Sequence, residues 1–452
     1  MSIQGRDGET LLDLLATGAG DAPAIRAPGE VPLDHGALRR HIERTAAALR
    51  ELGIARGDRV AIVLPNGAAM ATAFLGVAAA AVAAPLNPAY TRDELDFYLG
   101  DLSAKALIVA GDETGPAFAA AEARAIPLLR LTGDHARQDG AGAFRLEGAA
   151  ARASPTATGA PVAADDALVL HTSGTTSRPK IVPLTHANIA ASARNIAAAL
   201  ALTNSDVGLN IMPLFHIHGL IAGLLAPLSA GGAVVCTPGF NGLKFAGWLA
   251  AEQPTWYSAV PTMHQAILDR LARNPEAARA AALRFVRSSS ASLPPQVFHA
   301  LADLFGCPVI ESYGMTEAAH QMAANPLRAG AQKSGSVGIA AGPEVRIADA
   351  AGQFRAIDVE GEIVIRGANV TPGYADNPKA NAEAFFNARD GGDRWFRTGD
   401  LGRLDADGYL SVTGRIKEII NRGGEKIAPR EVDEVLMDHA GVAQALTFAM
   451  PH

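Results

Sequence analysis

Apolar residues along the first part of the chain switch between two spacings, and the switch predicts alternating helices and strands. Leu38–Leu52 has apolar residues at helical spacing, whereas Arg59–Leu64 and Ala106–Ala110 are short apolar runs that are typical of buried strands. The alanine-rich stretch Gly67–Pro85 is long enough to raise the question of a membrane span. Because alanine is weakly hydrophobic and strand-like runs flank the stretch, we expect a buried helix of an α/β layer.

A second alternating region follows a low-complexity stretch, Gly148–Asp165, which we interpret as a linker. The runs that predict strands are Leu168–Leu170, Ile181–Leu184, Val207–Met212, Ala233–Thr237, Trp256–Val260, Phe285–Ser288 and Val309–Ser312. The first two flank a polar loop and predict a hairpin, and the others alternate with helical segments. The expected fold class is therefore α/β, with mostly parallel sheets covered by helices on both faces.

The pattern changes at Gly335, after which short strands follow one another closely with Gly and Asp turns such as Asp405–Gly408. This spacing predicts a small antiparallel β-sheet or barrel, and the sequence after Arg415 becomes helical and charged. The predicted units are an N-terminal α/β subdomain (1–164), a second α/β subdomain with the polar loop (165–334), a small β-barrel subdomain (335–414) and a truncated, mobile α+β C-terminal domain (415–452).

Composition narrows the classes of partner and location. Acidic residues (46) outnumber basic ones (39) and give a net charge of −7, so we expect no nucleic-acid partner and no acidic membrane surface. Cys236 and Cys307 lie too far apart for metal-ligand spacing and fit small core residues in a reducing compartment. The first residues lack the pattern of a signal peptide. We expect a cytoplasmic monomer or homodimer without stable membrane insertion.

The loop Thr172–Lys180 (TSGTTSRPK) is the strongest chemical signal in the chain. It combines hydroxyl side chains with one glycine and a terminal lysine, between two predicted strands. Backbone N–H groups, hydroxyls and a cation are suited to binding a polyphosphate, and Gly174 lets the backbone approach it. The loop is not a P-loop, because Ile181 stands where that motif has a hydroxyl. A polar surface hairpin without a ligand is the alternative interpretation of this loop alone.

Further polar segments follow in a fixed order. They are Pro213–Gly219 (PLFHIHG), Glu311–His320 (ESYGMTEAAH), Arg397–Asp400 (RTGD) and Gly414–Ile427 (GRIKEIINRGGEKI). Together with the loop they resemble the adenylate-forming superfamily of acyl-CoA synthetases, luciferases and peptide-synthetase adenylation domains, over essentially the whole chain. The resemblance implies an AMP-forming acid–CoA ligase that uses ATP, Mg²⁺ and coenzyme A. A carboxylate attacks the α-phosphate, pyrophosphate leaves, and the acyl group then passes to the thiol.

The resemblance also assigns roles around the phosphates. Lys180 and its loop hold the β- and γ-phosphates, and Thr316 binds the α-phosphate. Glu317 is the implied magnesium ligand, with Thr175 or Thr176 nearby, since hard oxygen donors beside phosphates suit Mg²⁺. The implied catalytic residues are Lys180, His216, Thr316 and Glu317. Considered apart from the other motifs, Glu317 has a structural alternative: it is an exposed residue in the first turn of a helix.

Around the nucleoside, Tyr313 is expected to lie against the adenine and Asp400 to accept hydrogen bonds from the ribose hydroxyls. Arg415 is expected to reach the ribose or a phosphate. The complete implied nucleotide set is Thr172, Ser173, Gly174, Thr175, Thr176, Lys180, Ser290, Ala291, Ser292, Glu311, Ser312, Tyr313, Gly314, Thr316, Asp400 and Arg415. As a structural alternative, Asp400 caps a turn and Tyr313 is a core residue, but the shared order of the motifs favours the functional interpretation.

The acid is the least readable part of the predicted site. Arg287–Pro295 (RSSSASLPP) and Ser312–Pro326 resemble oxalyl-CoA synthetases. A small dianionic acid needs polar or cationic groups in its pocket, whereas a fatty or aryl acid needs apolar walls. The residues predicted to bind the acid are His216, His218, Ser289 and His320, with Ser288 and Ser290 as further candidates. On a helix, His320 would lie near the same face as Glu317.

Alternatives stay open for these residues and for the substrate. His216 has a core or surface position as its alternative, and His320 has a capped or solvent-facing one. The resemblance favours oxalate, and the alternative substrate is another short- or medium-chain acid or an aryl acid of the coumarate type.

The C-terminal segment carries further implied roles. By resemblance, Lys417 stands at the hinge of a mobile domain, and Gly423 and Gly424 belong to a loop that approaches coenzyme A. By resemblance, a lysine near the end of the family's C-terminal domain assists adenylation, and we see no matching segment near His452. We therefore expect ATP and acyl-AMP binding with weakened adenylation. Two rival classes stay open: a nucleotide-binding protein without activity, and an adenylating enzyme that loads a carrier protein.

Overall fold

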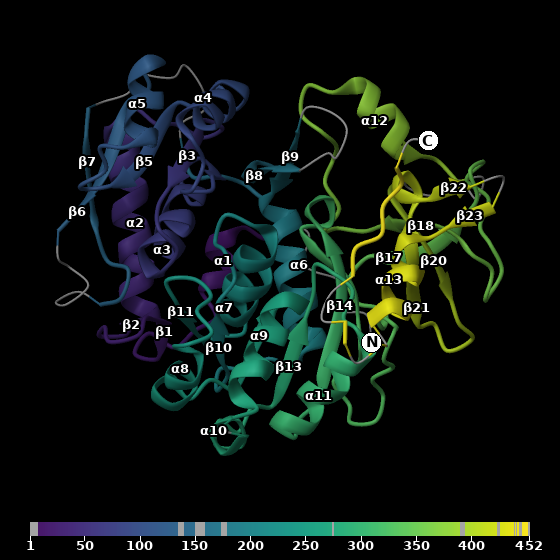
Figure 1. Ribbon diagram of the computed structural model, residues 1–452. Coiled ribbons are helices and arrows are strands. Elements are labelled where there is room, and N and C mark those ends of the chain that lie inside the picture. The colour runs from purple at the N-terminus through teal and green to yellow at the C-terminus, as the bar shows by residue number, and fades with distance from the viewer. Residues whose placement is uncertain are drawn as a thin grey trace.

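The computed structural model describes residues 8–133, 140–149, 159–172, 179–273, 275–388, 394–422, 425–437, 439, 441–442 and 445–450. In these residues two large sheets and their helices form the body of the molecule, and a smaller β-sheet lies beside them (Figure 1). The α/β fold class predicted from the alternating pattern is therefore confirmed.

A seven-stranded sheet has the order β7-β6-β5-β3-β4-β8-β9. Its strands are β3 (Arg59–Val63), β4 (Val82–Pro85), β5 (Ala106–Ala110), β6 (Leu128–Thr132), β7 (Arg145–Gly148), β8 (Asp166–Thr172) and β9 (Lys180–Thr185). One helix precedes these strands and three lie between them: α2 (His35–Glu51), then α3 (Ala68–Ala78), α4 (Arg92–Asp101) and α5 (Pro116–Ala123). Side chains alternate between the two faces, because Val60 and Ile62 join one core whereas Ala61 and Val63 join another.

The alanine-rich stretch is only partly the helix that its composition predicts. Its first part forms α3, but Val82–Pro85 is a fully buried parallel strand between β3 and β8. Alanine favours helices intrinsically, yet a position at the centre of a sheet overrides that preference. In the described part of the chain, no helix combines enough length with enough apolar residues to cross a membrane.

A nine-stranded sheet has the order β16-β15-β14-β13-β12-β10-β11-β1-β2. Its strands are β1 (Pro23–Arg26), β2 (Leu33–Asp34), β10 (Val207–Asn210), β11 (Ala233–Cys236), β12 (Trp256–Ala259), β13 (Phe285–Ser288), β14 (Val309–Met315), β15 (His320–Ala324) and β16 (Ile339–Ala340). The helices around it are α1 (Leu11–Leu15), α6 (His186–Ala199), the π-helix η2 (His218–Leu225), α7 (Ala226–Ser229), α8 (Phe245–Glu252), α9 (Pro261–Leu271), α10 (Pro275–Ala280) and α11 (Pro295–Phe305).

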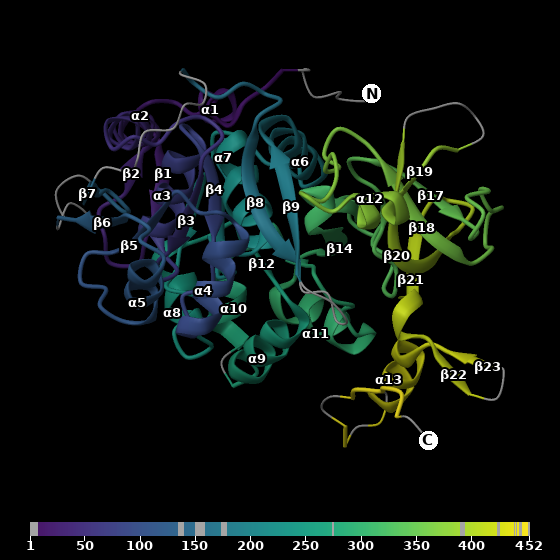
Figure 2. The same ribbon diagram turned by 90° about the horizontal axis from the view of Figure 1, so that it is seen from above.

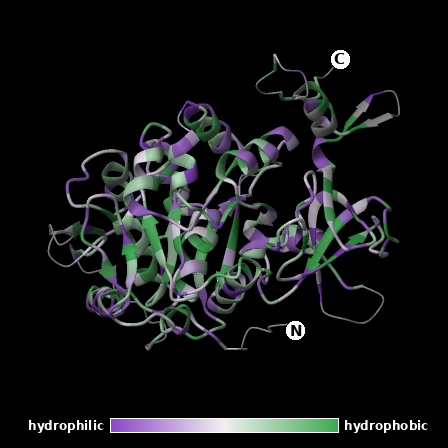
Figure 3. Ribbon diagram, turned by 90° about the horizontal axis from the view of Figure 1, so that it is seen from below, coloured by the Kyte–Doolittle hydropathy of each residue, from purple (hydrophilic) through white to green (hydrophobic). Residues whose placement is uncertain are grey.

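The main core lies between the two large sheets. It contains residues of α2, α3, α6 and η2 together with strand residues of both sheets. The outer face of the seven-stranded sheet is covered by α4 and α5, and that of the nine-stranded sheet by α8, α9 and α11. Figure 3 shows the same layering, with hydrophobic strands inside and hydrophilic colour concentrated on outer helices and loops. Because helices cover the faces of the sheets, we expect polar site residues in the loops at the carboxyl ends of the parallel strands.

The third sheet is antiparallel, as the close strand spacing predicts. It consists of β17 (Glu344–Ala348), β18 (Gly361–Arg366), β19 (Phe385–Phe386), β20 (Trp395–Leu404) and β21 (Leu410–Arg415), with α12 (Pro378–Ala384) beside it. The chain then continues through η4 (Ile416–Glu418), β22 (Ile420–Arg422), β23 (Glu425–Ile427) and α13 (Pro429–Met437). Figure 2 shows these last elements standing apart from the sheets, joined through β21. The predicted domain bounds stay predictions, although β1 and β2 pair within the nine-stranded sheet and β8 and β9 within the seven-stranded one.

Buried histidines make the stability of this fold sensitive to acid. Burial lowers the pKa of His186 to about 4 and that of His264 to about 3, from an ordinary value of 6.5. The unfolded chain binds these protons more readily, so the stability present above pH 6.5 is lost as the pH falls below that value. Each group then lowers the free energy of unfolding by about 2 kcal/mol at about pH 5 relative to neutral pH.

We expect the His264→Gln variant to depend less on pH than the wild-type protein. Between about pH 7.5 and about pH 5, its free energy of unfolding should fall by about 2 kcal/mol less, as measured by urea denaturation. His299→Gln changes an exposed histidine and is the matched control. Equal pH dependence of H264Q and wild type would contradict the assignment of the acid sensitivity to this buried imidazole.

Candidate adenylation site

The predicted phosphate loop connects two paired strands. β8 and β9 are antiparallel, with Thr172 opposite Lys180, so the hairpin expected from the flanking apolar runs is confirmed. Lys180 is the first residue of β9. Residues 173–178, which include the predicted ligands Ser173, Gly174, Thr175 and Thr176, lie outside the described residues, and their roles stay predictions.

Lys180 and Glu317 meet on two parts of one aromatic side chain. Glu317 lies in η3 (Thr316–Ala318), a short turn between β14 and β15, and only 6% of it is exposed. Its Oε1 accepts a hydrogen bond from the Tyr374 hydroxyl at 2.8 Å, and Nζ of Lys180 lies 4.3 Å from the centre of the Tyr374 ring. Burial raises the pKa of Glu317, while the Tyr374 hydrogen bond opposes that shift. The alternative interpretation of Glu317 as an exposed helix residue is therefore wrong.

A second polar corner joins the large and small sheets. Asp400, on β20, is 4% exposed and accepts hydrogen bonds from the Tyr313 hydroxyl at 2.5 Å and from Nε of Arg415 at 2.8 Å. Burial and the Asp400 carboxylate hold the pKa of Tyr313 well above its usual range, so the phenol stays a donor. The side chain of Asp400 thus bonds to residues from β14 and β21, and the predicted Tyr313, Asp400 and Arg415 lie together.

The predicted residues at the end of β14 are bound to the neighbouring backbone. Oε1 of Glu311 accepts a hydrogen bond from the Leu293 amide, and the Ser312 hydroxyl donates to the Ser288 carbonyl. The Ser289 hydroxyl donates in turn to the Ser312 carbonyl. These bonds hold β13 and β14 in register at their carboxyl ends. A Cβ at Gly314 would lie 2.0 Å from the His320 carbonyl oxygen, so only glycine allows the close approach of β14 to β15 there.

A buried arginine, which the sequence interpretation did not single out, lies behind these strand ends. Arg287 on β13 is 0% exposed, and its guanidinium contacts four polar side chains. One terminal nitrogen lies 3.1 Å from Ser258 Oγ and 3.3 Å from His218 Nε2. The other lies 3.1 Å from His320 Nε2 and 3.2 Å from Gln321 Oε1. These five residues are the arginine cluster.

The arginine cluster carries a positive charge without an acidic partner in the described part of the chain. Burial lowers the pKa of Arg287 to about 9, which leaves it charged at neutral pH. Burial and the nearby Arg287 hold the pKa values of His218 and His320 well below their usual range, so both imidazoles are neutral. A buried cation without a counter-ion is costly unless an anion joins it. The sequence signal for this residue was the segment Arg287–Pro295, of which it is the first residue.

The two predicted histidines of the arginine cluster are brought together, but not on a helix. The rings of His218 and His320 stack with 4.8 Å between their centroids. His320 begins strand β15, so its expected position on a helix face with Glu317 is wrong; Gly314 and the antiparallel partner strand extend the chain there. His320 has a φ of 99° and Ser290 a φ of 72°, which are strained for these residue types. Backbone strain of this kind gathers at functional sites.

Ser290 connects the arginine cluster to a surface cleft. Its Oγ lies 3.0 Å from Nδ1 of His218, and the residues after it, Ala291 and Ser292, line a cleft of about 650 Å³. Lys417, the predicted hinge residue, lines the opposite wall with neighbours from η4 and α13. His216 is exposed beside Phe215, although its surroundings lower its pKa through desolvation, and its predicted role near the acid and phosphates stays a prediction. Gly423 and Gly424 lie outside the described residues.

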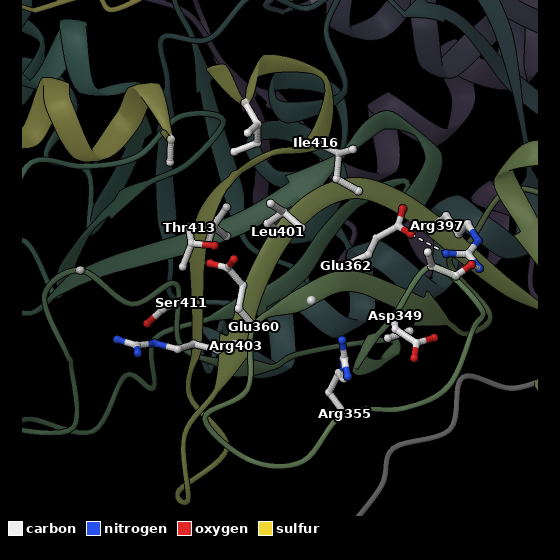
Figure 4. A pocket seen from close by; sticks show the side chains of 17 residues that line it. Asp349, Arg355, Glu360, Glu362, Arg397, Leu401, Arg403, Ser411, Thr413 and Ile416 are labelled. Atoms are coloured by element: carbon white, nitrogen blue, oxygen red, sulfur yellow. Dashed lines mark hydrogen bonds and ion pairs between the residues drawn. The ribbon is translucent and has the colours of Figure 1, made fainter. Parts of the chain in front are cut away.

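A larger hollow of about 1090 Å³ lies on the small sheet and carries none of the predicted site residues. Figure 4 shows its wall of charged side chains, where Arg397 and Glu362 form an ion pair 2.6 Å long. Leu401 lines the hollow, and because side chains alternate along β20 its neighbour Asp400 points to the other face. The hollow is therefore separate from the Tyr313–Asp400–Arg415 corner.

Comparisons with known proteins agree with this geometry. The family model of the AMP-binding enzymes matches residues 13–375. The chain is 45% identical to an oxalate–CoA ligase of Arabidopsis thaliana over 98% of this chain and 86% of the relative. It is 36% identical to a sulfoacetate–CoA ligase of Cupriavidus necator over 98% and 85%, respectively. The ATP-bound crystal structure of MatB from Rhodopseudomonas palustris superposes with a TM-score of 0.84 at 29% identity, covering 98% of this chain and 86% of MatB.

The fold and these matches define an adenylate-forming enzyme, and the chain belongs to the AMP-binding enzyme family. It is an AMP-forming acid–CoA ligase that uses ATP and coenzyme A and activates a carboxylic acid. The family resemblance predicted from the ordered motifs is confirmed.

Proposed function

We propose that this ligase activates oxalate. One oxalate carboxylate attacks the α-phosphorus of ATP, the bond to pyrophosphate breaks, and the thiol of coenzyme A then displaces AMP from the oxalyl group. The arginine cluster is the observation that carries this proposal. A monocarboxylic acid has no second charge to offer Arg287, whereas oxalate carries a second carboxylate bonded directly to the reacting one. The 45% and 40% identical relatives of Arabidopsis thaliana and Saccharomyces cerevisiae, both named oxalate–CoA ligases, support the same choice.

The proposed roles of the nucleotide residues follow their positions. Tyr313 packs on the adenine, Asp400 accepts from the ribose hydroxyls, and Arg415 balances the Asp400 charge. Lys180 attracts the β- and γ-phosphates from the start of β9. Thr316, directly before Glu317 in η3, donates to the α-phosphate in this proposal. The side chains of Glu311 and Ser312 already bond to neighbouring backbone groups. We therefore propose that Glu311, Ser312 and Gly314 contact the nucleotide through their backbone groups.

Magnesium fits the donors that are present. Within the described residues no group of three His, Cys, Asp or Glu side chains gathers at one point, so an all-protein metal cage is not available there. Mg²⁺ bound with a nucleotide needs only one or two carboxylates, because phosphates and water complete its shell. We therefore propose Glu317 as its protein ligand, where the ion neutralises phosphate charge.

The cleft beside Ser292 is the proposed route for coenzyme A. It lies between the main body and the segment after β21, and it ends near Ser290, which touches the arginine cluster. A thiol entering there approaches the acyl group from the side away from pyrophosphate. Lys417 in its wall fits the hinge role, and Gly423 and Gly424 the coenzyme A loop, as proposals. The free cysteines Cys236 and Cys307 support the proposed reducing, cytoplasmic location.

Pyrophosphate release with a panel of acids tests the proposal. We expect kcat/KM for oxalate to exceed that for glyoxylate, acetate and p-coumarate by about 100-fold or more, because a buried cation left without its anion costs several kcal/mol. Sulfoacetate, a longer dianion, tests the length of the pocket. Hydroxylamine trapping of the acyl group separates adenylation from thioester formation. Higher kcat/KM for acetate or p-coumarate than for oxalate would refute oxalate as the substrate.

A further inference from the structure

A short segment between β18 and α12 ties the phosphate hairpin to Glu317. The backbone amide of Thr371 donates to the Glu317 carbonyl at 2.7 Å, and its hydroxyl donates to the Pro183 carbonyl of β9 at 2.6 Å. Four residues on, the Ala375 amide donates to the Ile181 carbonyl of β9 at 3.0 Å. The segment Thr371–Ala375 therefore crosses from η3 to β9 and fixes the distance between them.

Tyr374 is the side chain that this crossing segment places between Lys180 and Glu317. It is 7% exposed; its hydroxyl donates to Glu317 Oε1 at 2.8 Å, and its ring face meets Nζ of Lys180 at 4.3 Å from the centroid. No ion pair joins Lys180 to Glu317 among the contacts of the described residues. Opposite charges in a low-dielectric site attract strongly. Tyr374 contacts both of these charged groups, one through its ring and the other through its hydroxyl.

We propose that Tyr374 is a positioning residue for the metal–nucleotide site: it separates the Lys180 ammonium from the Glu317 carboxylate and aims each at its own target. A direct Lys180–Glu317 ion pair would have to break before the carboxylate could bind a metal and the ammonium a phosphate. The tyrosine replaces that pair with a cation–π contact and a hydrogen bond, both weaker, so the site is preorganised. The inference rests on the proposed role of Glu317 as the magnesium ligand.

Binding of ATP, measured by calorimetry without any acid, tests this role. The variant Y374F keeps the ring and loses the hydroxyl, and it should weaken binding of ATP with Mg²⁺ by about 3- to 10-fold, because one hydrogen bond to a charged group is lost. Y374A also removes the spacer and should weaken it by about 30-fold or more, because the freed charges pair with each other. With EDTA in place of Mg²⁺, ATP affinity of Y374F should stay within about twofold of wild type.

Tyr409→Phe is the matched control. Its hydroxyl donates to the Ala331 carbonyl at 2.7 Å, and Nζ of Lys333 lies 3.9 Å from its ring centre, so it loses the same kind of contact elsewhere on the protein. Y409F should bind ATP with Mg²⁺ like wild type. Equal loss of ATP affinity by Y374F with and without Mg²⁺, or no loss at all, would overturn the positioning role while leaving the proposed oxalate chemistry intact. If wild-type ATP binding itself ignores Mg²⁺, both the positioning role and the metal assignment fall.

Discussion

Replacing Arg287 with methionine will remove the preference for oxalate while leaving the nucleotide site intact. Methionine replaces the apolar stem of the arginine and carries no charge, so in the proposed complex the acid would meet only the neutral His218 and His320. We expect kcat/KM for oxalate to fall by about 100-fold or more, because a buried, charge-assisted pair is worth several kcal/mol when one partner is deleted. The affinity for ATP in the absence of acid should stay within about twofold. Steady-state kinetics and calorimetry give the two numbers.

Two controls separate charge from geometry in this prediction. Arg287→Lys keeps the charge but loses the planar fork that contacts both histidines, so it should recover part of the activity. Arg346→Met deletes an exposed arginine that pairs with Glu344, and it should change nothing. If R287M turns over oxalate as fast as wild type, the acid does not contact the arginine cluster.

The arginine cluster also predicts how the acid affects stability. Burial lowers the pKa of Arg287 to about 9, which means that the fold disfavours the charged form of this side chain. An anion that pairs with the guanidinium relieves that cost only in the folded state. In the presence of a non-reactive ATP analogue, adding oxalate should therefore raise the melting temperature of the wild type further and leave that of R287M unchanged. Thermal unfolding with and without oxalate measures both.

Ordered motifs identified side chains that lie together in the structure, but residues whose contacts come from distant parts of the chain were missed. Asp400, Tyr313 and Arg415 were assigned by motif order, and their side chains meet as that order implies. Arg287 lies between Val286 and Ser288 on β13, and nothing in that local sequence shows that His320 and Gln321 approach it from β15, two strands away in the sheet.

Tyr374 and the elements around it show the same limit for packing. A tyrosine in an irregular segment has many possible neighbours, and only the crossing from η3 to β9 places it on Lys180 and Glu317. The strand Val82–Pro85 was hidden in an alanine run because periodicity cannot distinguish a buried helix from a buried central strand. The position of Tyr374 and the strand Val82–Pro85 are both fixed by tertiary contacts rather than by local preference.

Replacing Asp400 with alanine will cost more ATP affinity than any other single change outside the phosphate loop. The buried carboxylate accepts from Tyr313 and Arg415 and, in the proposed complex, from both ribose hydroxyls. We expect the dissociation constant of ATP to rise by about 100-fold or more, because two charge-assisted acceptors are lost and two donors are left unpaired. Inhibition by pyrophosphate, which has no ribose, should be unchanged. Asp405→Ala, at a partly exposed ion pair in the turn between β20 and β21, should bind ATP like wild type.

The ribose assignment itself is tested by removing the ligand's half of the contact. For the wild type, 2′-deoxy-ATP should bind about 10-fold more weakly than ATP, since one hydrogen bond to a buried carboxylate is missing. D400A has already lost that acceptor, so it should bind the two nucleotides equally, as a double-mutant cycle between protein and ligand requires. Equal discrimination by D400A and wild type would place the 2′-hydroxyl elsewhere and reduce Asp400 to the structural partner of Tyr313 and Arg415. Because the comparison uses one protein against two ligands, a general weakening of the fold cannot produce the expected result.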